Sequence, residues 1–350
     1  MLTIDGSHGE GGGQILRSTL TLAAVTGRAV RLTHIRANRS SPGLHPQHLT
    51  AVRAAAAVCN ADLEGDMLDS QTVTFIPQSP PQAGDYTFDV TEVAGRGSAG
   101  SVTLVLQTIL LPLAVPEGKS TVTLRGGTAV PMSPPVPYLE KVYIPTLFEL
   151  GVRARIDHRL WGFYPRGGGE LVAEITGGVE LQGRIFGPQG TLDRVEGLAF
   201  AANLPSHIPQ RMTNRARSLL RDAGMKTRIE PRHVPSPGTG TGLFLCARYD
   251  PLPAGFLMLG RRGLPSEEVA EIACKALLAH HKTGTVADMH LADQLVLPFA
   301  LAEGASHLSV SKVTRHLQTN VWVAHQFGFD ELRLEGELNE TGTLSMGYEG

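Results

Sequence analysis

The stretch Gly9-Glu10-Gly11-Gly12-Gly13-Gln14-Ile15-Leu16-Arg17-Ser18 sets a run of glycines between a short N-terminal strand and an apolar helix. Because glycine has no side chain, the backbone N–H groups of such a turn can approach a ligand closely. The start of the following helix directs the positive end of its dipole at the same place. The turn therefore suits a phosphate, although a glycine run can also serve only as a tight connection between strand and helix.

The charge that follows the glycine run favours the phosphate interpretation. Six arginines and not one acidic residue occur between Gly11 and Ala61, whereas the formal net charge of the whole chain is only -2. A local excess of positive charge in a nearly neutral protein indicates a local anionic partner.

The pattern that begins at the glycine run occurs three times. Apolar periodicity and helix-ending glycines predict a helix, a strand, a second helix and then a pair of strands in each copy. The first helix, strand and second helix cover 14–26, 29–33 and 46–59, then 102–115, 120–124 and 138–150, then 291–302, 307–310 and 314–327. With the strand that precedes each first helix, the unit is βαβαββ, and the fold class is α+β.

The spacing of the glycines that end the first helices predicts one inserted domain. Gly27 and Gly118 are 91 residues apart, whereas Gly118 and Gly304 are 186 apart, an excess of 95. The expected limits are 1–80 for repeat 1, 81–178 for repeat 2, 179–184 with 283–350 for repeat 3, and 185–282 for a small α/β insert domain.

Composition excludes several classes of protein. The chain has 350 residues, 42% of them apolar, with no run of apolar residues long enough for a membrane span and no basic and apolar signal region at Met1. We expect a cytoplasmic protein with no membrane partner. The three cysteines are widely spaced, which predicts buried thiols and neither a zinc site nor a disulfide framework.

The helix starts of the third repeat are unusually polar. The segment 290–294 opens the first helix with a histidine and an acid, and the segment 314–320 opens the second helix with His316. An imidazole at a helix start can be kept neutral and nucleophilic by the positive dipole end, although a capping or surface histidine would look the same. Asp293 has a comparable alternative as a first-turn acid that complements the dipole.

A glycine motif in the second repeat could mislead. Residues 95–100 satisfy the GxGxxG pattern of dinucleotide-binding proteins. They occupy the same place in the second copy as the glycine run does in the first, and βαβαββ units are not a doubly wound series. We interpret them as a turn.

Seven motifs, in order along nearly the whole chain, together closely resemble the RNA 3'-terminal phosphate cyclase family. They are Glu10-Gly-Gly-Gly-Gln-Ile-Leu-Arg-Ser18, Ile35-Arg-Ala-Asn-Arg39, Pro42-Gly-Leu44 with Gln47-His-Leu-Thr-Ala-Val52, Gly97-Ser-Ala-Gly-Ser101 with Leu104-Val-Leu-Gln-Thr108, Gly162-Phe-Tyr-Pro-Arg-Gly-Gly-Gly169, His290-Leu-Ala-Asp-Gln-Leu295 and His316-Leu-Gln-Thr-Asn320. The resemblance implies three repeats of the initiation-factor-three C-terminal type, as in enolpyruvyl transferase domains, and a thioredoxin-like insert.

The same resemblance implies an ATP-dependent enzyme that converts an RNA 3'-terminal phosphate to a 2',3'-cyclic phosphate. A histidine, which His316 matches, attacks the α-phosphate of ATP and forms a covalent histidine-AMP. AMP then passes to the RNA 3'-phosphate, and the neighbouring 2'-OH closes the ring and releases AMP. Covalent catalysis of this kind divides one difficult activation into two easier steps.

The remaining site residues are also implied by the resemblance. The ATP-binding positions are Gln107, His290, Leu291, Ala292, Asp293 and Gln294. Glu10 matches a carboxylate near the phosphates that would help to hold a divalent ion, Mg or Mn. The positions associated with the RNA end are Arg17, Arg36, Arg39 and Gln47. Position 290 is histidine where some relatives carry tyrosine, and either ring offers an aromatic surface to the adenine.

Three other functions would fit parts of the pattern. A non-enzymatic cyclase-like protein of ribosome assembly would lack the nucleophile, which His316 argues against. An enolpyruvyl transferase would need six repeat units in two balanced domains. A simple RNA-binding module would show no dependence on ATP. The sequence leaves the oligomeric state, the physiological RNA and the role of the insert open.

Overall fold

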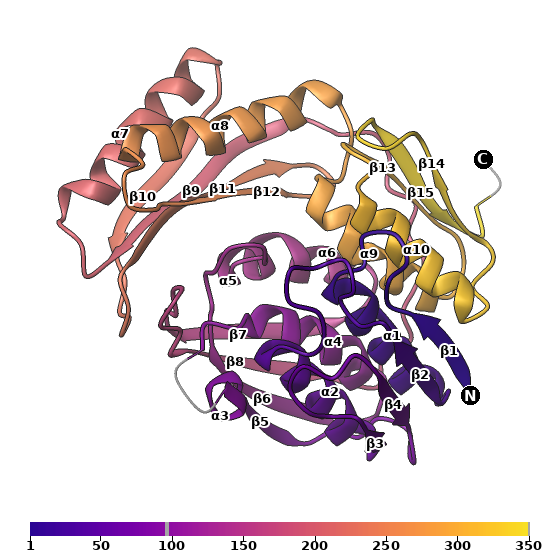
Figure 1. Cartoon of the computed structure of the whole chain (residues 1–350). Coiled ribbons are helices and arrows are strands. Elements are labelled where there is room, and N and C mark those ends of the chain that lie inside the picture. Colours follow the sequence, from indigo (N-terminus) through magenta and orange to yellow (C-terminus); the bar gives the residue numbers. More distant parts are fainter. Residues whose placement is uncertain (95–97, 349–350) are drawn as a thin grey trace.

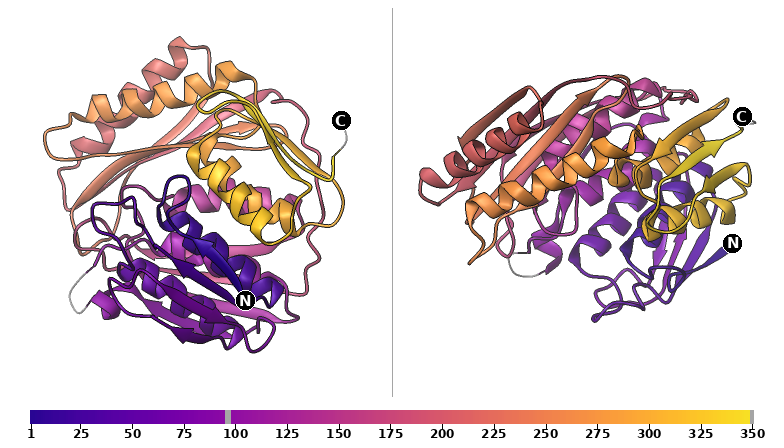
Figure 2. Two further views of the ribbon diagram at one scale, coloured as in Figure 1. Left: turned by 45° about the vertical axis from the view of Figure 1, so that its right-hand side comes forward. Right: turned by 90° about the horizontal axis from the view of Figure 1, so that it is seen from above.

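The computed structural model describes residues 1–94 and 98–348. Residues 95–97, which form part of the glycine motif discussed above, lie outside this description. Three α/β units pack with their helices together, and a fourth unit with its own sheet extends over them (Figures 1 and 2). The mixed α+β class with repeated βαβαββ units is confirmed, as the strand orders show.

The first repeat contains every element that the sequence predicts. These are β1 (Leu2–Asp5), α1 (Gly13–Thr26), β2 (Val30–Thr33), α2 (Pro46–Cys59), β3 (Asp62–Glu64) and β4 (Val73–Ile76). The sheet has the order β1-β2-β4-β3, in which β1 and β2 are parallel and the other pairs antiparallel. The glycine run therefore connects the edge strand β1 to α1, a helix whose inner face is fully buried.

The second repeat follows the same plan with an altered second helix. Its elements are β5 (Asp85–Asp89), α3 (Val90–Ala94), α4 (Val102–Ala114), β6 (Lys119–Gly126), α5 (Val136–Tyr138), η1 (Leu139–Tyr143), α6 (Ile144–Glu149), β7 (Arg153–Leu160) and β8 (Gly169–Thr176). The single helix expected over 138–150 is wrong in this detail, because η1 is a π-helical turn. Pro145 has no N–H to donate, which disfavours regular α-helical hydrogen bonding just before it.

The third repeat has α9 (Met289–Leu301), β13 (Ser306–Val310), α10 (Arg315–Gln326), β14 (Leu332–Glu335) and β15 (Gly342–Met346). Its sheet has the order β13-β15-β14. In place of a regular first strand, Gln182 and Ile185 form isolated parallel bridges with Glu303 and His307. This pairing extends to Phe186, whose N–H donates to His307 O at 2.8 Å.

The insert has β9 (Leu192–Ala202), α7 (His207–Asp222), β10 (Thr227–His233), β11 (Gly240–Tyr249), β12 (Ala254–Leu259) and α8 (Ser266–Thr283). Its sheet has the order β10-β9-β11-β12, and α7 and α8 cover its outer face (Figure 1). The inner face packs against the second repeat, where the rings of Trp161 and Phe200 lie 4.5 Å apart. Because the strands form four separate sheets, we propose the domain limits given above for the three repeats and the insert.

Helices from all three repeats meet in one apolar core. α1 contacts α2, α4 and α10, and α9 contacts α10. As a result, the starts of α1, α9 and α10 come together although they are far apart in the sequence. None of the helices in the described part of the chain combines the length and apolar character needed to cross a membrane.

Candidate active site

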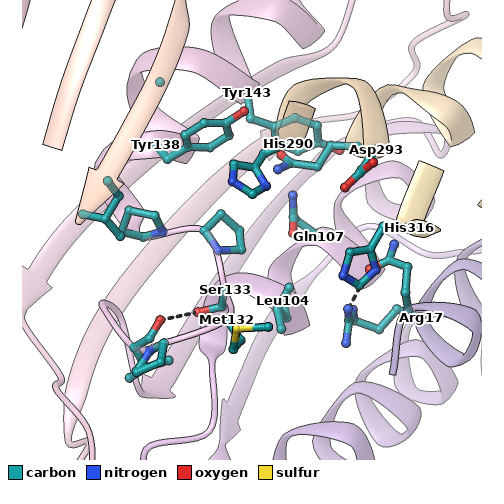
Figure 3. A pocket seen from close by; sticks show the side chains of 18 of the residues that line it. Arg17, Leu104, Gln107, Met132, Ser133, Tyr138, Tyr143, His290, Asp293 and His316 are labelled. Carbon is teal, nitrogen blue, oxygen red and sulfur yellow. Dashed lines mark hydrogen bonds between the residues drawn. The ribbon is translucent and has the colours of Figure 1, made fainter. Parts of the chain in front are cut away.

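A cavity of about 590 Å³ lies between α1, α4, the start of α9 and strand β12 of the insert. Its polar lining includes residues from all three repeats and one arginine of the insert: Gln14, Arg17, Gln107, His290, Asp293, Gln294, His316 and Arg261. Figure 3 shows Gln107 and His290 pointing into the same space, with Asp293 and His316 at its other side. The structure therefore brings together four of the predicted ATP-binding residues, the predicted nucleophile and Arg17.

His316 lies in the first turn of α10. Thr314 is the N-cap of this helix, and its side chain accepts a hydrogen bond from Leu317 N at 2.9 Å. Nδ1 of His316 is 2.6 Å from Oε2 of Glu10, which belongs to the glycine turn. Burial lowers the pKa of His316, and the positive charges of Arg17 and Arg39 lower it further against the opposing effect of Asp293. The lowered pKa favours the neutral form of the imidazole, the form that the predicted nucleophile needs.

Asp293 supports the start of α10 as well as lining the cavity. Its Oδ1 accepts a hydrogen bond from Oγ1 of Thr314 at 2.5 Å, while its backbone oxygen accepts one from Nδ2 of Asn320 at 2.8 Å. Asn320 in turn accepts from Oγ of Ser18 at 2.7 Å, across 302 positions of sequence. Burial raises the pKa of Asp293 to about 7. These bonds tie α9, α10 and α1 together around His316.

Asp288 is a buried residue of the site that sequence reasoning missed. As the N-cap of α9, it accepts hydrogen bonds from the backbone N–H groups of His290 and Leu291. It also accepts from the hydroxyl of Tyr138 and from Gly255 N, each at about 3.0 Å. An acid just before a helix was a visible capping signal, but the sequence gives no sign of its partners in α5 and β12.

The apolar walls of the cavity were also missed. They are formed by the segment 130–135, by Tyr138 and Tyr143 of the interrupted helix, and by residues 257–259 of β12. The ring of His290 meets that of Tyr138 edge to face, with 6.5 Å between centroids and an angle of 86°. No motif marks this wall in the sequence, since it is assembled from two units, the second repeat and the insert.

The glycine turn carries the second part of the site. Arg39 forms an ion pair with Glu10, whose side chain is 18% exposed. The positive charges of Arg17, Arg36 and Arg39 all contribute to lowering the pKa of the buried His48, after burial itself. Arg39 and Arg17 lie against Gly12 and Gly13 at the start of α1.

Four other residues predicted for the site are buried or form hydrogen bonds within the protein. The side chains of Leu291 and Ala292 are buried in the core. Nη1 of Arg36 donates to Ser41 O at 2.7 Å and to Gly43 O at 2.8 Å. Oε1 of Gln47 accepts a hydrogen bond from Ser101 N at 2.7 Å. Arg36 and Gln47 thus shape the loops around the site, and their predicted contacts with RNA remain predictions.

For a divalent ion the chain offers Glu10. Within residues 1–94 and 98–348, no three His, Cys, Asp or Glu side chains form a metal-binding group. The oxygens of Glu10 face Arg39 and His316, so this carboxylate is already in a polar, charged setting. A single carboxylate fits the way in which magnesium is usually held, with the other ligands supplied by substrate phosphates and water.

A cavity with a histidine, buried carboxyl groups and neighbouring arginines has the features of an active site for anionic substrates. The chain belongs to the RNA 3'-terminal phosphate cyclase family, because the family model of that description matches residues 8–333. The family resemblance inferred from the seven motifs is confirmed, and the chain is an enzyme of this family.

Individual relatives support the same assignment. RNA 3'-terminal phosphate cyclase from Methylococcus capsulatus is 55% identical over 344 residues, covering 98% of this chain and 95% of the relative. Proteins of the same name from Trichormus variabilis and Pyrococcus abyssi are 52% and 39% identical, over 95% and 99% of this chain and 95% and 98% of their own lengths.

Among solved structures, the enolpyruvyl transferase NikO from Streptomyces tendae aligns with a TM-score of 0.39 and 11% identity, over 98% of this chain and 47% of its own.

Proposed function

We propose that this enzyme uses ATP to convert an RNA 3'-terminal phosphate to a 2',3'-cyclic phosphate, through covalent histidine-AMP and RNA-adenylate intermediates. The observation that carries the proposal is the position of His316. This neutral imidazole stands between a cavity lined by the ATP-binding positions and the arginines around the glycine turn. It can therefore face a nucleotide on one side and an RNA end on the other.

In the first stage, His316 acts as the nucleophile. Nδ1 lies 2.6 Å from the Glu10 carboxylate, and with the ring proton assigned to Nδ1 the free electron pair is on Nε2. Nε2 attacks the α-phosphorus of ATP, the bond from that phosphorus to the bridging oxygen breaks, and diphosphate leaves. Gln107, His290, Asp293 and Gln294 hold the nucleoside in the cavity. A divalent ion beside Glu10 would neutralise phosphate charge.

In the second stage, a phosphate oxygen of the RNA end attacks the phosphorus of the histidine-bound AMP, and the bond to Nε2 breaks. The neighbouring 2'-OH then attacks the activated 3'-phosphorus, loses its proton and expels AMP. A phosphate monoester is a poor electrophile until it carries such a leaving group, which explains the need for ATP. Arg17 and Arg39 suit the binding of the RNA phosphate through charged, bidentate hydrogen bonds, with Arg36 and Gln47 beside them.

The test is incubation with ATP labelled at the α-phosphate, followed by denaturing electrophoresis. We expect the wild type to retain this label in an acid-labile, alkali-stable bond and to retain none from γ-labelled ATP. His316→Ala should abolish labelling, whereas His207→Ala, at the exposed start of α7, should label normally. Undiminished labelling of His316→Ala would refute the assignment, and no labelling of the wild type would favour a simple RNA-binding module.

A further inference from the structure

A buried histidine that the proposed chemistry does not use lies directly behind the glycine turn. His48 is only 5% exposed and sits in the first turn of α2. A β-carbon built on Gly13 would come within 2.4 Å of its Nε2 and within 3.0 Å of Nη1 of Arg17. The edge of the imidazole, the guanidinium of Arg17 and the first residue of α1 therefore share one small space.

The hydrogen bonding of His48 indicates which of its two ring nitrogens carries the proton. The backbone N–H of His45 donates to Nδ1 of His48 at 3.3 Å, so Nδ1 must carry the lone pair. In the neutral ring the proton is then on Nε2. Burial, the three neighbouring arginines and His45 all lower the pKa of His48, which keeps the ring neutral. Nε2–H forms no hydrogen bond to the residues that the structure describes.

The surroundings of this donor suit an anion. Gly12, the N-cap of α1, has no side chain to satisfy the first N–H groups of this 14-residue helix. Arg17 approaches from α1, and Arg39 lies against Gly12, where its Nη2 would be 2.7 Å from an added β-carbon. His48 does not line the nucleotide cavity, whereas Arg17 does. The space at Gly12 and Gly13 therefore adjoins the nucleotide cavity across Arg17.

We propose that His48 donates a hydrogen bond from Nε2 to the 3'-terminal phosphate of the RNA, held at the start of α1 between Arg17 and Arg39. This inference rests on the proposed function and assigns a further substrate-binding residue to its second stage. A neutral N–H beside two guanidinium groups stabilises the phosphate without adding a third charge. The bond strengthens as charge on the phosphate oxygens rises during the attack by the 2'-OH.

Two substitutions separate this role from a structural one. His48→Gln keeps an amide N–H close to the position of Nε2 but loses the acceptor for His45 N. His48→Asn keeps an acceptor close to Nδ1 but has no donor at the Nε2 position. If His48 serves only as a capping residue, His48→Asn should stay active and His48→Gln should lose activity. If His48 binds the phosphate, His48→Gln should stay active and His48→Asn should lose activity.

The experiment starts from the isolated, AMP-labelled adduct of each variant and follows a single turnover with RNA ending in 3'-phosphate. We expect adducts to form at wild-type rates in both variants, His48→Asn to slow the RNA stage about tenfold to a hundredfold, and His48→Gln to stay within a few fold of wild type. Retained activity in His48→Asn, or equal losses in both variants, would overturn the proposal. Absence of any adduct in the wild type would instead refute the proposed function.

Discussion

The replacement of Asp288 tests how the structure assembles the cavity. Its carboxylate lies where α9, strand β12 of the insert and α5 of the second repeat meet, and the residue is only 1% exposed. Four groups donate to it: the hydroxyl of Tyr138, Gly255 N, His290 N and Leu291 N. Asp288→Ala removes the side-chain acceptor of these four donors and changes no residue that lines the cavity.

The size of the effect follows from the burial of the donors. Loss of an N-cap side chain destabilises a protein by about 1 kcal/mol. Each buried donor left without a partner adds about 1–3 kcal/mol, and Tyr138 and Gly255 both lie in the interface with the insert. We therefore expect Asp288→Ala to lower the free energy of unfolding by about 3–7 kcal/mol, which combines the lost cap with the two unpaired donors. Asp288→Asn keeps the shape and an acceptor oxygen, so it should lose only about 1–2 kcal/mol.

The assay is urea denaturation in a Trp322→Phe background, followed by the fluorescence of Trp161. This ring packs against Phe200 of the insert and so reports on the same interface. Asp222→Ala at the exposed end of α7 is the matched control and should change little. The double variant with Tyr138→Phe should show a coupling of about 0.5–3 kcal/mol, because the two side chains share a hydrogen bond. A loss below about 1 kcal/mol in Asp288→Ala, or equal losses in the Ala and Asn variants, would refute the reasoning.

Three further predictions concern the site itself. Asp293 has a folded-state pKa of about 7, above the usual unfolded value near 3.9. Its contribution to stability is therefore full below about pH 4 and is lost as the pH rises through 7. Asp293→Asn should flatten the dependence of the unfolding free energy on pH over that range, and an unchanged slope would contradict this. Arg36→Ala and Arg39→Ala should leave labelling by ATP intact and slow cyclisation about tenfold to a hundredfold, whereas equal losses in both stages would mean that they serve ATP or the fold. Gly13→Ala would place a β-carbon 2.4 Å from Nε2 of His48, whereas the β-carbon of Gly12→Ala would meet mainly the flexible end of Arg39. Gly13→Ala should therefore impair the RNA stage more than Gly12→Ala. Similar rates for the two variants would argue against close packing at Gly13.

The sequence by itself determined the units of this protein. Apolar periodicity, helix-ending glycines and the spacing of Gly27, Gly118 and Gly304 are local signals, and they were sufficient for the three repeats and the inserted domain. The seven motifs were sufficient for the family. One local feature was not anticipated: the π-helical turn at Leu139–Tyr143, which lies just before Pro145 and its missing N–H.

Only the tertiary structure decided which side chains meet. The contact between Glu10 and His316, the hydrogen bond from Ser18 to Asn320, and the meeting of Asp288, Tyr138 and Gly255 join segments from different repeats. Local patterns carry no information about such pairs, because they arise from the packing of α1, α9 and α10 and from the position of the insert. For the same reason His48 had no assigned role within its sequence motif, and only the approach of α2 to the glycine turn shows what its ring faces.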